Sequence, residues 1–102
     1  MPKLKKPLSA AERIAAREAL MESLDRGDIT IGQAIRKMRL EWTGLSQGQF
    51  GKLVGVSANT LSAIERDADN ANTQTLRQIL RRFGMVLTIR PTPEHLGDGQ
   101  AL

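Results

Sequence analysis

The residues best suited to a specific chemical task lie within Leu45–Glu65, where short side chains open a predicted helix. Ala58, Asn59 and Thr60 follow the predicted N-cap Ser57, and none of them carries a carboxylate that would repel phosphate. An asparagine amide can form two hydrogen bonds with one adenine, and an alanine methyl can contact the methyl group of thymine. These residue types predict contact with the edges of base pairs, whereas the competing interpretation makes them solvated surface positions.

Other polar and basic residues near this helix could hold the phosphates of a nucleic-acid backbone. Lys52, Ser62 and Arg66 are the candidates, because cations and hydroxyls are common phosphate ligands. Further basic residues are expected to lie on solvated faces and to supply a diffuse positive field; they are Arg36, Lys37, Arg77, Arg81 and Arg82.

The composition limits the other kinds of chemistry. The chain carries 15 Lys and Arg against 11 Asp and Glu, a net charge of +4, which permits a polyanionic partner. It has no cysteine, so zinc–thiolate sites and thiol nucleophiles are excluded. His95 is the single histidine, no glycine-rich phosphate loop occurs, and the polar stretch 67–71 lacks calcium-loop spacing. We therefore expect neither an enzyme nor a bound cofactor or metal.

Two further exclusions concern single strands and membranes. The aromatic residues are Trp42, Phe50 and Phe83, too few for the stacking platforms that bind single-stranded nucleic acids. Neither the apolar h-region typical of a signal peptide nor an apolar run of about 18 residues is seen in the sequence. We expect no membrane partner and a cytoplasmic location.

Five helices and one strand are expected to position these residues. Capping residues and apolar periodicity predict helices over 9–25, 30–41, 46–54, 57–66 and 72–83. The run Met85–Ile89 breaks the helical period, favours β-structure and is closed by Pro91, which predicts a strand. The fold class is all-α with a short C-terminal β-strand. The expected organisation is an arm and helix over 1–29, a DNA-binding domain over 30–84, a dimerisation strand over 85–90 and a flexible tail over 91–102.

The two helices around Gly55 have the spacing of a helix-turn-helix. Glycine suits this turn because the turn needs a positive φ. Gly51 faces the second helix where only a small side chain permits a close approach. In this arrangement the second helix enters the major groove of duplex DNA by its N-terminal end.

These residues resemble the Xre, or phage-repressor, family of helix-turn-helix domains over about Ile31–Phe83. The resemblance has two departures: the family usually has alanine at Gly51, and the link over 39–44 is one residue longer than usual, which leaves the position of Trp42 open. The matching motifs are Leu45-Ser46-Gln47, Phe50-Gly51, Gly55-Val56-Ser57, Leu61-Ser62 and Glu65.

The resemblance implies roles for three more residues. In the family, the position of Gln47 contacts a phosphate. An arginine late in the first core helix pairs there with a glutamate at the end of the recognition helix, and the matching residues are Arg39 and Glu65. This pair would fix the recognition helix to the core without contacting bases.

A narrower resemblance, over 31–90, is to the HipB-like antitoxins. The strand over 85–90 directly follows the last helix, and the loop Arg66–Asn72 has a similar length. This subgroup represses its own operon and binds a HipA-like kinase toxin, so the resemblance implies the same partner here. The alternative is a stand-alone Xre-type regulator without a toxin. The helix over 9–25 lies outside this resemblance.

The run Met85–Ile89 also predicts a homodimer, because the chain offers no second strand to pair with it. The strand comprises Met85, Val86, Leu87, Thr88 and Ile89. A lone strand edge is unstable and invites a second chain. Antiparallel pairing of two copies would bury Val86 or Leu87 across the symmetry axis, and such a dimer would bind a pseudo-palindromic operator.

Overall fold

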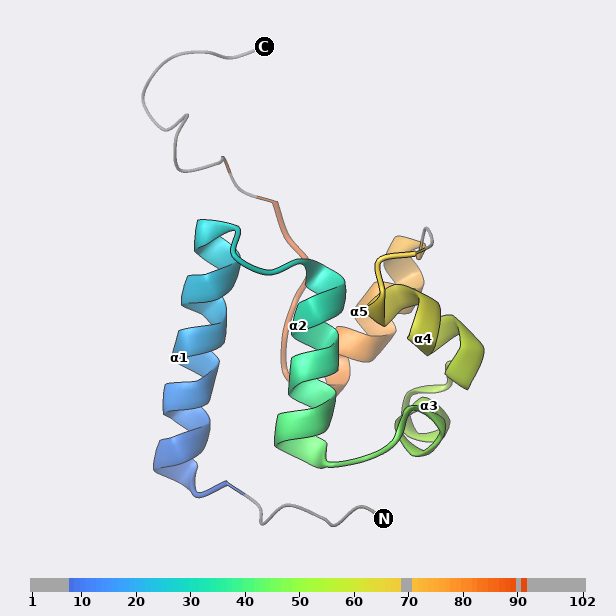
Figure 1. Ribbon diagram of the computed structural model, residues 1–102, viewed down its shortest axis with the longest axis horizontal. Helices are drawn as coiled ribbons and strands as arrows, with labels where there is room; N and C mark the ends of the chain where they lie inside the picture. The colour runs from blue at the N-terminus through green and yellow to red at the C-terminus, as the bar shows by residue number, and fades with distance from the viewer. Residues whose placement is uncertain (1–7, 69–70, 90, 92–102) are drawn as a thin grey trace.

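Short α-helices pack around a single small core in the computed structural model, which describes residues 8–68, 71–89 and 91. The expected basic arm up to residue 7, Arg90, and the expected tail from residue 92 with His95 lie outside the described residues. The elements in chain order are α1 (Ala10–Arg26), α2 (Ile31–Met38), η1 (Arg39–Thr43), α3 (Gln47–Val54), α4 (Ala58–Glu65) and α5 (Thr73–Arg82) (Figure 1).

Each α-helix begins at a side chain that accepts a hydrogen bond from the third helical amide. The expected capping boxes Ser9–Glu12 and Thr30–Gln33 are both present. The remaining N-caps are Ser46, Ser57 and Asn72, as predicted. Such caps satisfy amides that have no intrahelical acceptor, and each contributes about 1 kcal/mol. The α-helices therefore start within one residue of their predicted positions.

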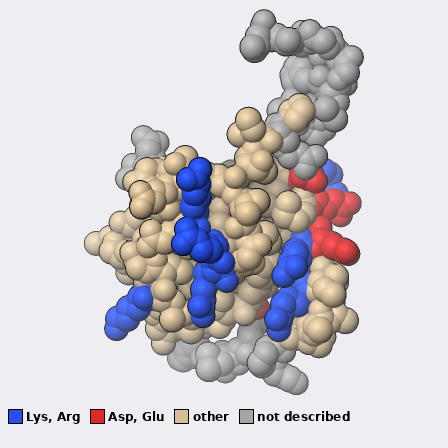
Figure 2. Space-filling model, turned by 180° about the vertical axis from the view of Figure 1, so that it is seen from behind, with Lys and Arg blue, Asp and Glu red and all other residues tan. Residues whose placement is uncertain are grey.

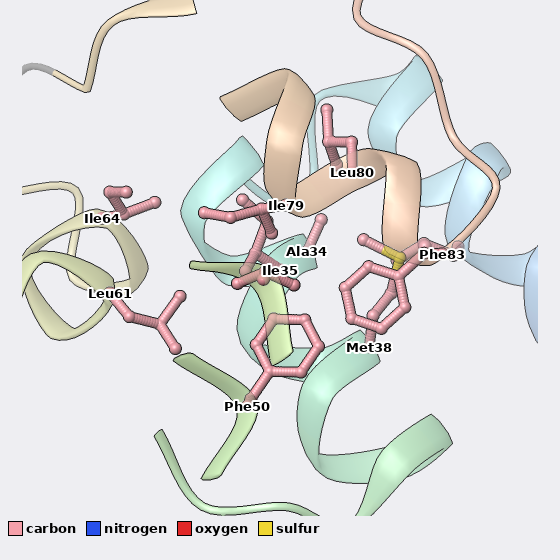
Figure 3. Packing of buried hydrophobic residues seen from close by; sticks show 11 residues of the cluster. Ala34, Ile35, Met38, Phe50, Leu61, Ile64, Ile79, Leu80 and Phe83 are labelled. Carbon is pink, nitrogen blue, oxygen red and sulfur yellow. The ribbon is translucent and has the colours of Figure 1, made fainter. Parts of the chain in front are cut away.

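The core is built from apolar residues of α2 to α5 together with Leu20 of α1 and Phe83, with aromatic rings at one end (Figure 3). Phe50 of α3 stacks on Phe83, with ring centroids 5.2 Å apart and planes inclined by 15°. Ile35, Leu61 and Ile79 are fully buried and come from α2, α4 and α5 respectively. Every helix of the predicted DNA-binding domain thus contributes to one core, which fixes α3 and α4 relative to α2.

The link after α2 differs from the prediction. The helix expected to continue to Glu41 ends at Met38, and the chain continues as the π-helix η1. The amide of Gly44 donates to the carbonyl of Arg39 at 2.9 Å, a bond that spans five residues instead of four. A π-turn accommodates one additional residue within a helix, which accounts for the longer link. Trp42 lies in this turn and packs edge-on against Phe83.

The predicted C-terminal strand is not observed among the described residues. Residues 85–89 form no helix and no strand in the single chain (Figure 1). Their exposure nevertheless alternates at first: Met85 and Leu87 pack against the core, whereas Val86 is 82% exposed. A strand needs a partner strand, and the described part of this chain supplies none.

The helix α1 lies beside α2 and attaches to the core through few residues (Figure 1). Leu20 is buried and Leu24 is partly buried, but Ile14 is 57% exposed. A cleft of about 400 Å³ separates α1 and α2 from residues 85–88. The predicted DNA-binding domain is therefore held together mainly by contacts among α2 to α5.

No helix in the described ranges is long and apolar enough to cross a membrane.

Candidate nucleic-acid interface

The turn between α3 and α4 is fixed by hydrogen bonds to one carbonyl. Gly55 has φ +75°, as its position in the turn requires, and its amide donates to the carbonyl of Gly51 at 2.8 Å. The amide of Val56 donates to the same carbonyl at 3.0 Å. From α5, the side chain of Gln78 donates to the carbonyl of Val54 at 2.6 Å. The last turn of α3 is therefore held both by the amides of the turn that leads to α4 and by Gln78 of α5.

Gly51 allows α3 and the start of α4 to approach closely. A Cβ atom at this position would lie 2.3 Å from the carbonyl oxygen of Val56 and 3.7 Å from the amide nitrogen of Ala58. The first of these distances is far shorter than any real carbon–oxygen contact. The close approach expected from the sequence is present, and it involves backbone atoms that cannot move aside as a side chain could.

The first turn of α4 projects into solvent without a negative charge. Ala58, Asn59 and Thr60 are exposed, and the turn contains no acidic residue. Leu61 and Ile64, by contrast, are buried against the core. The helix therefore presents its N-terminal end outward while its apolar side holds it in place, which is the orientation that groove binding requires.

Ser57 holds this exposed end in its helical form. Its hydroxyl accepts from the amide of Thr60 at 3.1 Å and donates to the hydroxyl of Thr60 at 2.9 Å. The amides of Ala58 and Asn59, at the first two helical positions, have no intrahelical acceptor. Free amides and the positive end of the helix dipole favour an anion here.

An ion pair fixes the other end of α4. The guanidinium of Arg39 donates to both carboxylate oxygens of Glu65, at 2.7 and 2.8 Å, and to the carbonyl of Leu45 at 2.8 Å. The side chains of Arg39 and Glu65 are 6% and 1% exposed. The structure thus brings together the two residues that the family resemblance paired, and it connects α4 to the end of α2.

Gln47 lies partly buried beside this pair. Its amide nitrogen donates to a carboxylate oxygen of Glu65 at 3.1 Å. A side-chain amide has two N–H groups, so one remains for a phosphate, as does the backbone N–H at the start of α3. The contact of Gln47 with Glu65 joins residues 18 apart, so no local pattern indicates it.

The other predicted phosphate ligands are distributed over the two helices, with Lys52 on α3 and the other two on or just after α4. Lys52 is exposed in the last turn of α3. Ser62 is half-buried in α4, and its hydroxyl accepts from the guanidinium of the exposed Arg66 at 3.5 Å. Ser62 therefore lies one turn along α4 from Asn59, and Arg66 lies at the C-terminal end of the helix.

These features agree with what comparison with known families finds. Residues 35–86, about half of the chain, match the family described as Helix-turn-helix. The chain belongs to this helix-turn-helix family. The family is of the Xre type; its members are DNA-binding transcriptional regulators, and it is not an enzyme family. The searches of curated proteins and of solved structures gave no match.

The helix-turn-helix protein carries much of its positive charge outside α4. Figure 2 shows Lys and Arg side chains across the middle of one face, with Asp and Glu gathered at one edge. Arg77, Arg81 and Arg82 of α5 are exposed and form no ion pair with another described residue. No group of three acidic or histidine side chains within the described ranges is arranged to hold a metal ion.

Asp67, just beyond the end of α4, has a structural role that the sequence does not indicate. It begins the polar stretch 67–71, of which Asp69 and Asn70 lie outside the described residues. Asp67 itself has φ +54° and accepts a hydrogen bond from the side chain of Thr30 at 2.6 Å. The partners are 37 residues apart, so no local pattern could have indicated the contact.

Proposed function

We propose that this regulator reads duplex DNA in a sequence-specific way through the N-terminal end of α4, and that it acts as a repressor. The observation that carries the proposal is the exposed, acid-free first turn of a helix whose other end is held by a buried ion pair. A reading helix must be accessible where it meets bases and rigid where it meets its own domain. The helix α4 meets both requirements.

In this proposal Asn59 reads a base edge, with Ala58 and Thr60 beside it. Asn59 is exposed and its side chain has no hydrogen bond to another described residue. An asparagine with a free amide can pair with the two groups that adenine presents in the major groove. The methyl groups of Ala58 and Thr60 suit a neighbouring thymine methyl.

The proposed phosphate ligands surround this end of the helix and continue along it. Ser57 and the free amides of the first turn hold one phosphate, and the N–H groups of Gln47 hold another. Lys52, Ser62 and Arg66 are the remaining candidates. Contacts of this kind set the register of the protein on DNA but carry no sequence information.

We propose further that two copies bind one operator. Val86 and Ile89 are 82% and 94% exposed, directly after α5. Pairing of residues 85–90 with the same residues of a second copy would cover Val86 and give the backbone a partner strand. The proposed units are then the DNA-binding domain over 30–84 and a dimerisation segment over 85–90.

The finer role that we propose is a HipB-like antitoxin that represses its own operon and binds a kinase-like toxin. Support comes from the apolar segment that directly follows α5 and leaves Val86 exposed. A stand-alone regulator is the alternative, and the two roles share the same DNA-binding surface. A kinase-like protein encoded beside this chain, and its co-purification with it, would separate them.

A binding selection on randomised duplexes tests the proposed function. We expect the purified full chain to enrich a pseudo-palindrome whose half-sites are centred about 34–36 Å apart, one helical turn of DNA. Enrichment of no motif would refute sequence reading. Enrichment of a single asymmetric half-site would refute the paired arrangement but leave sequence reading intact.

A further inference from the structure

The carboxylate of Asp67, just beyond the end of α4, contacts the beginning of α2. One oxygen accepts from the hydroxyl of Thr30 at 2.6 Å, and the other accepts from the amide of Gly32 at 3.3 Å. Asp67 has φ +54°, the one positive φ of a non-glycine among the described residues. Aspartate tolerates this conformation better than most residues, although glycine adopts it most readily.

This contact supplies a negative charge and a hydrogen-bond acceptor to the first turn of α2, which has no acidic residue of its own. The cap of this turn, Thr30, serves only the amide of Gln33. Asp67 brings a negative charge to the positive end of the helix dipole and accepts from the amide of Gly32, which has no intrahelical acceptor. The end of α4 therefore acts as an N-terminal cap of α2.

Gly32 is the residue that makes the contact possible. A Cβ atom there would lie 2.3 Å from the carbonyl oxygen of Ile64 and 2.5 Å from a carboxylate oxygen of Asp67. The backbone of α4 therefore rests directly on the first turn of α2. Any side chain at position 32 would push the two helices apart.

The recognition helix is consequently tied to α2 at two places. Glu65 is bound to Arg39, just after the last residue of α2, and Asp67 is bound to the first turn of α2. The eight residues of α2 span about 12 Å, so the two ties are well separated. The buried side chains of α4 already hold it against the core, and two separate ties restrict its remaining tilt more than the ion pair alone would.

We propose that Asp67 is a positioning residue for base reading: its bonds to Thr30 and Gly32 set the tilt of α4 and hence the place of Asn59. This inference rests on the proposed function. Asn59 lies about 9 Å along the helix from Glu65, so a tilt of roughly 10° would move it by about 1.5 Å. A displacement of that size is enough to break a two-bond contact with a base, because hydrogen bonds weaken steeply with distance and angle.

Three variants separate the carboxylate contact from the backbone conformation. Asp67→Gly keeps the positive φ but loses both bonds. Asp67→Asn keeps tolerance of the positive φ and one oxygen acceptor. Asp28→Gly, which removes an exposed acid paired with Arg26 at the end of α1, is the matched control.

Two readouts are taken at a temperature at which each full-chain variant is fully folded by its melting curve. The first is selectivity, the affinity for the selected operator divided by that for random duplex. We expect Asp67→Gly to lose about fivefold to tenfold in selectivity at unchanged random-duplex affinity, and Asp67→Asn to stay within about twofold of the unaltered chain. A change in stability alone would leave the selectivity of the folded protein unchanged.

The second readout is amide hydrogen exchange of α4 in the free protein, which does not depend on DNA. We expect faster exchange at the C-terminal turn of α4 in Asp67→Gly but not in Asp28→Gly. If the unaltered chain shows no selectivity, the proposed function fails and exchange alone decides the positioning role. Unaltered exchange in Asp67→Gly, or unaltered selectivity in a chain that does select a sequence, would overturn the inference.

Discussion

Removal of the Glu65 side chain should destabilise the domain far more than the loss of an ordinary ion pair. Glu65→Ala leaves the guanidinium of Arg39, which is 6% exposed, without its carboxylate. Of its three hydrogen bonds in the structure, only the one to the carbonyl of Leu45 would remain. A buried charge that has lost its partner keeps the cost of its removal from water.

The expected loss is about 3–5 kcal/mol of the free energy of unfolding, the range measured for broken buried pairs. For a domain of this size, 1 kcal/mol lowers the melting temperature by about 4–8 °C, so the shift should be at least about 12 °C. The matched control is Glu41→Ala, which removes an exposed partner of Lys37. That variant should lose no more than about 1 kcal/mol.

Urea denaturation of both variants, followed by circular dichroism, measures these losses. The double variant Arg39→Met, Glu65→Leu should recover much of the stability, because it removes the buried charges together. If Glu65→Ala unfolds at nearly the same urea concentration as Glu41→Ala, the pair is not what holds α4 to α2, and the reasoning is wrong.

Three further predictions concern the turn, the dimer and the DNA backbone. Gly51→Ala should destabilise the domain by about 1 kcal/mol or more in urea melts, because the clash with the carbonyl of Val56 outweighs the better helix propensity of alanine; higher stability would contradict this. Val86→Glu should shift the chain from dimer to monomer in analytical ultracentrifugation at micromolar concentration, and a dimer that survives deletion of residues 85–102 would exclude the proposed segment. Lys52→Ala should weaken binding to the operator and to random duplex about equally, and it should lower the number of counterions released on binding, measured from the salt dependence of the affinity, by about one. The control Arg17→Ala on α1 also removes one positive charge but should change neither the affinity nor its salt dependence.

The sequence was informative wherever a local pattern decides the structure. The boxes at Ser9 and Thr30 and the turn at Gly55 depend on neighbours within a few residues, and all three were predicted correctly. The buried pair of Arg39 with Glu65 could be anticipated only through the family resemblance, since its members are 26 residues apart.

Other features depend on choices that a local pattern leaves open. An extra residue between Arg39 and Gly44 could have been placed in the loop, but η1 accommodates it as a π-turn, where Trp42 can reach Phe83. The contact of Asp67 with Thr30 arises only when α4 packs on α2. Gly32 does not reveal this packing in the sequence, because a glycine can occur within a helix for many different reasons. The strand predicted over 85–89 was not found, because strand pairing is a property of two segments rather than of one.

The most direct test of base reading by α4 is the affinity of Asn59→Ala for two duplexes, the selected operator and a random sequence, at one fixed salt concentration. Because Asn59 is exposed and outside the core, the variant should fold as the unaltered chain does. We predict a loss of about 1–3 kcal/mol in binding free energy on the operator and little change on the random duplex. An equal loss on both duplexes, or no loss on the operator, would contradict sequence reading by this helix.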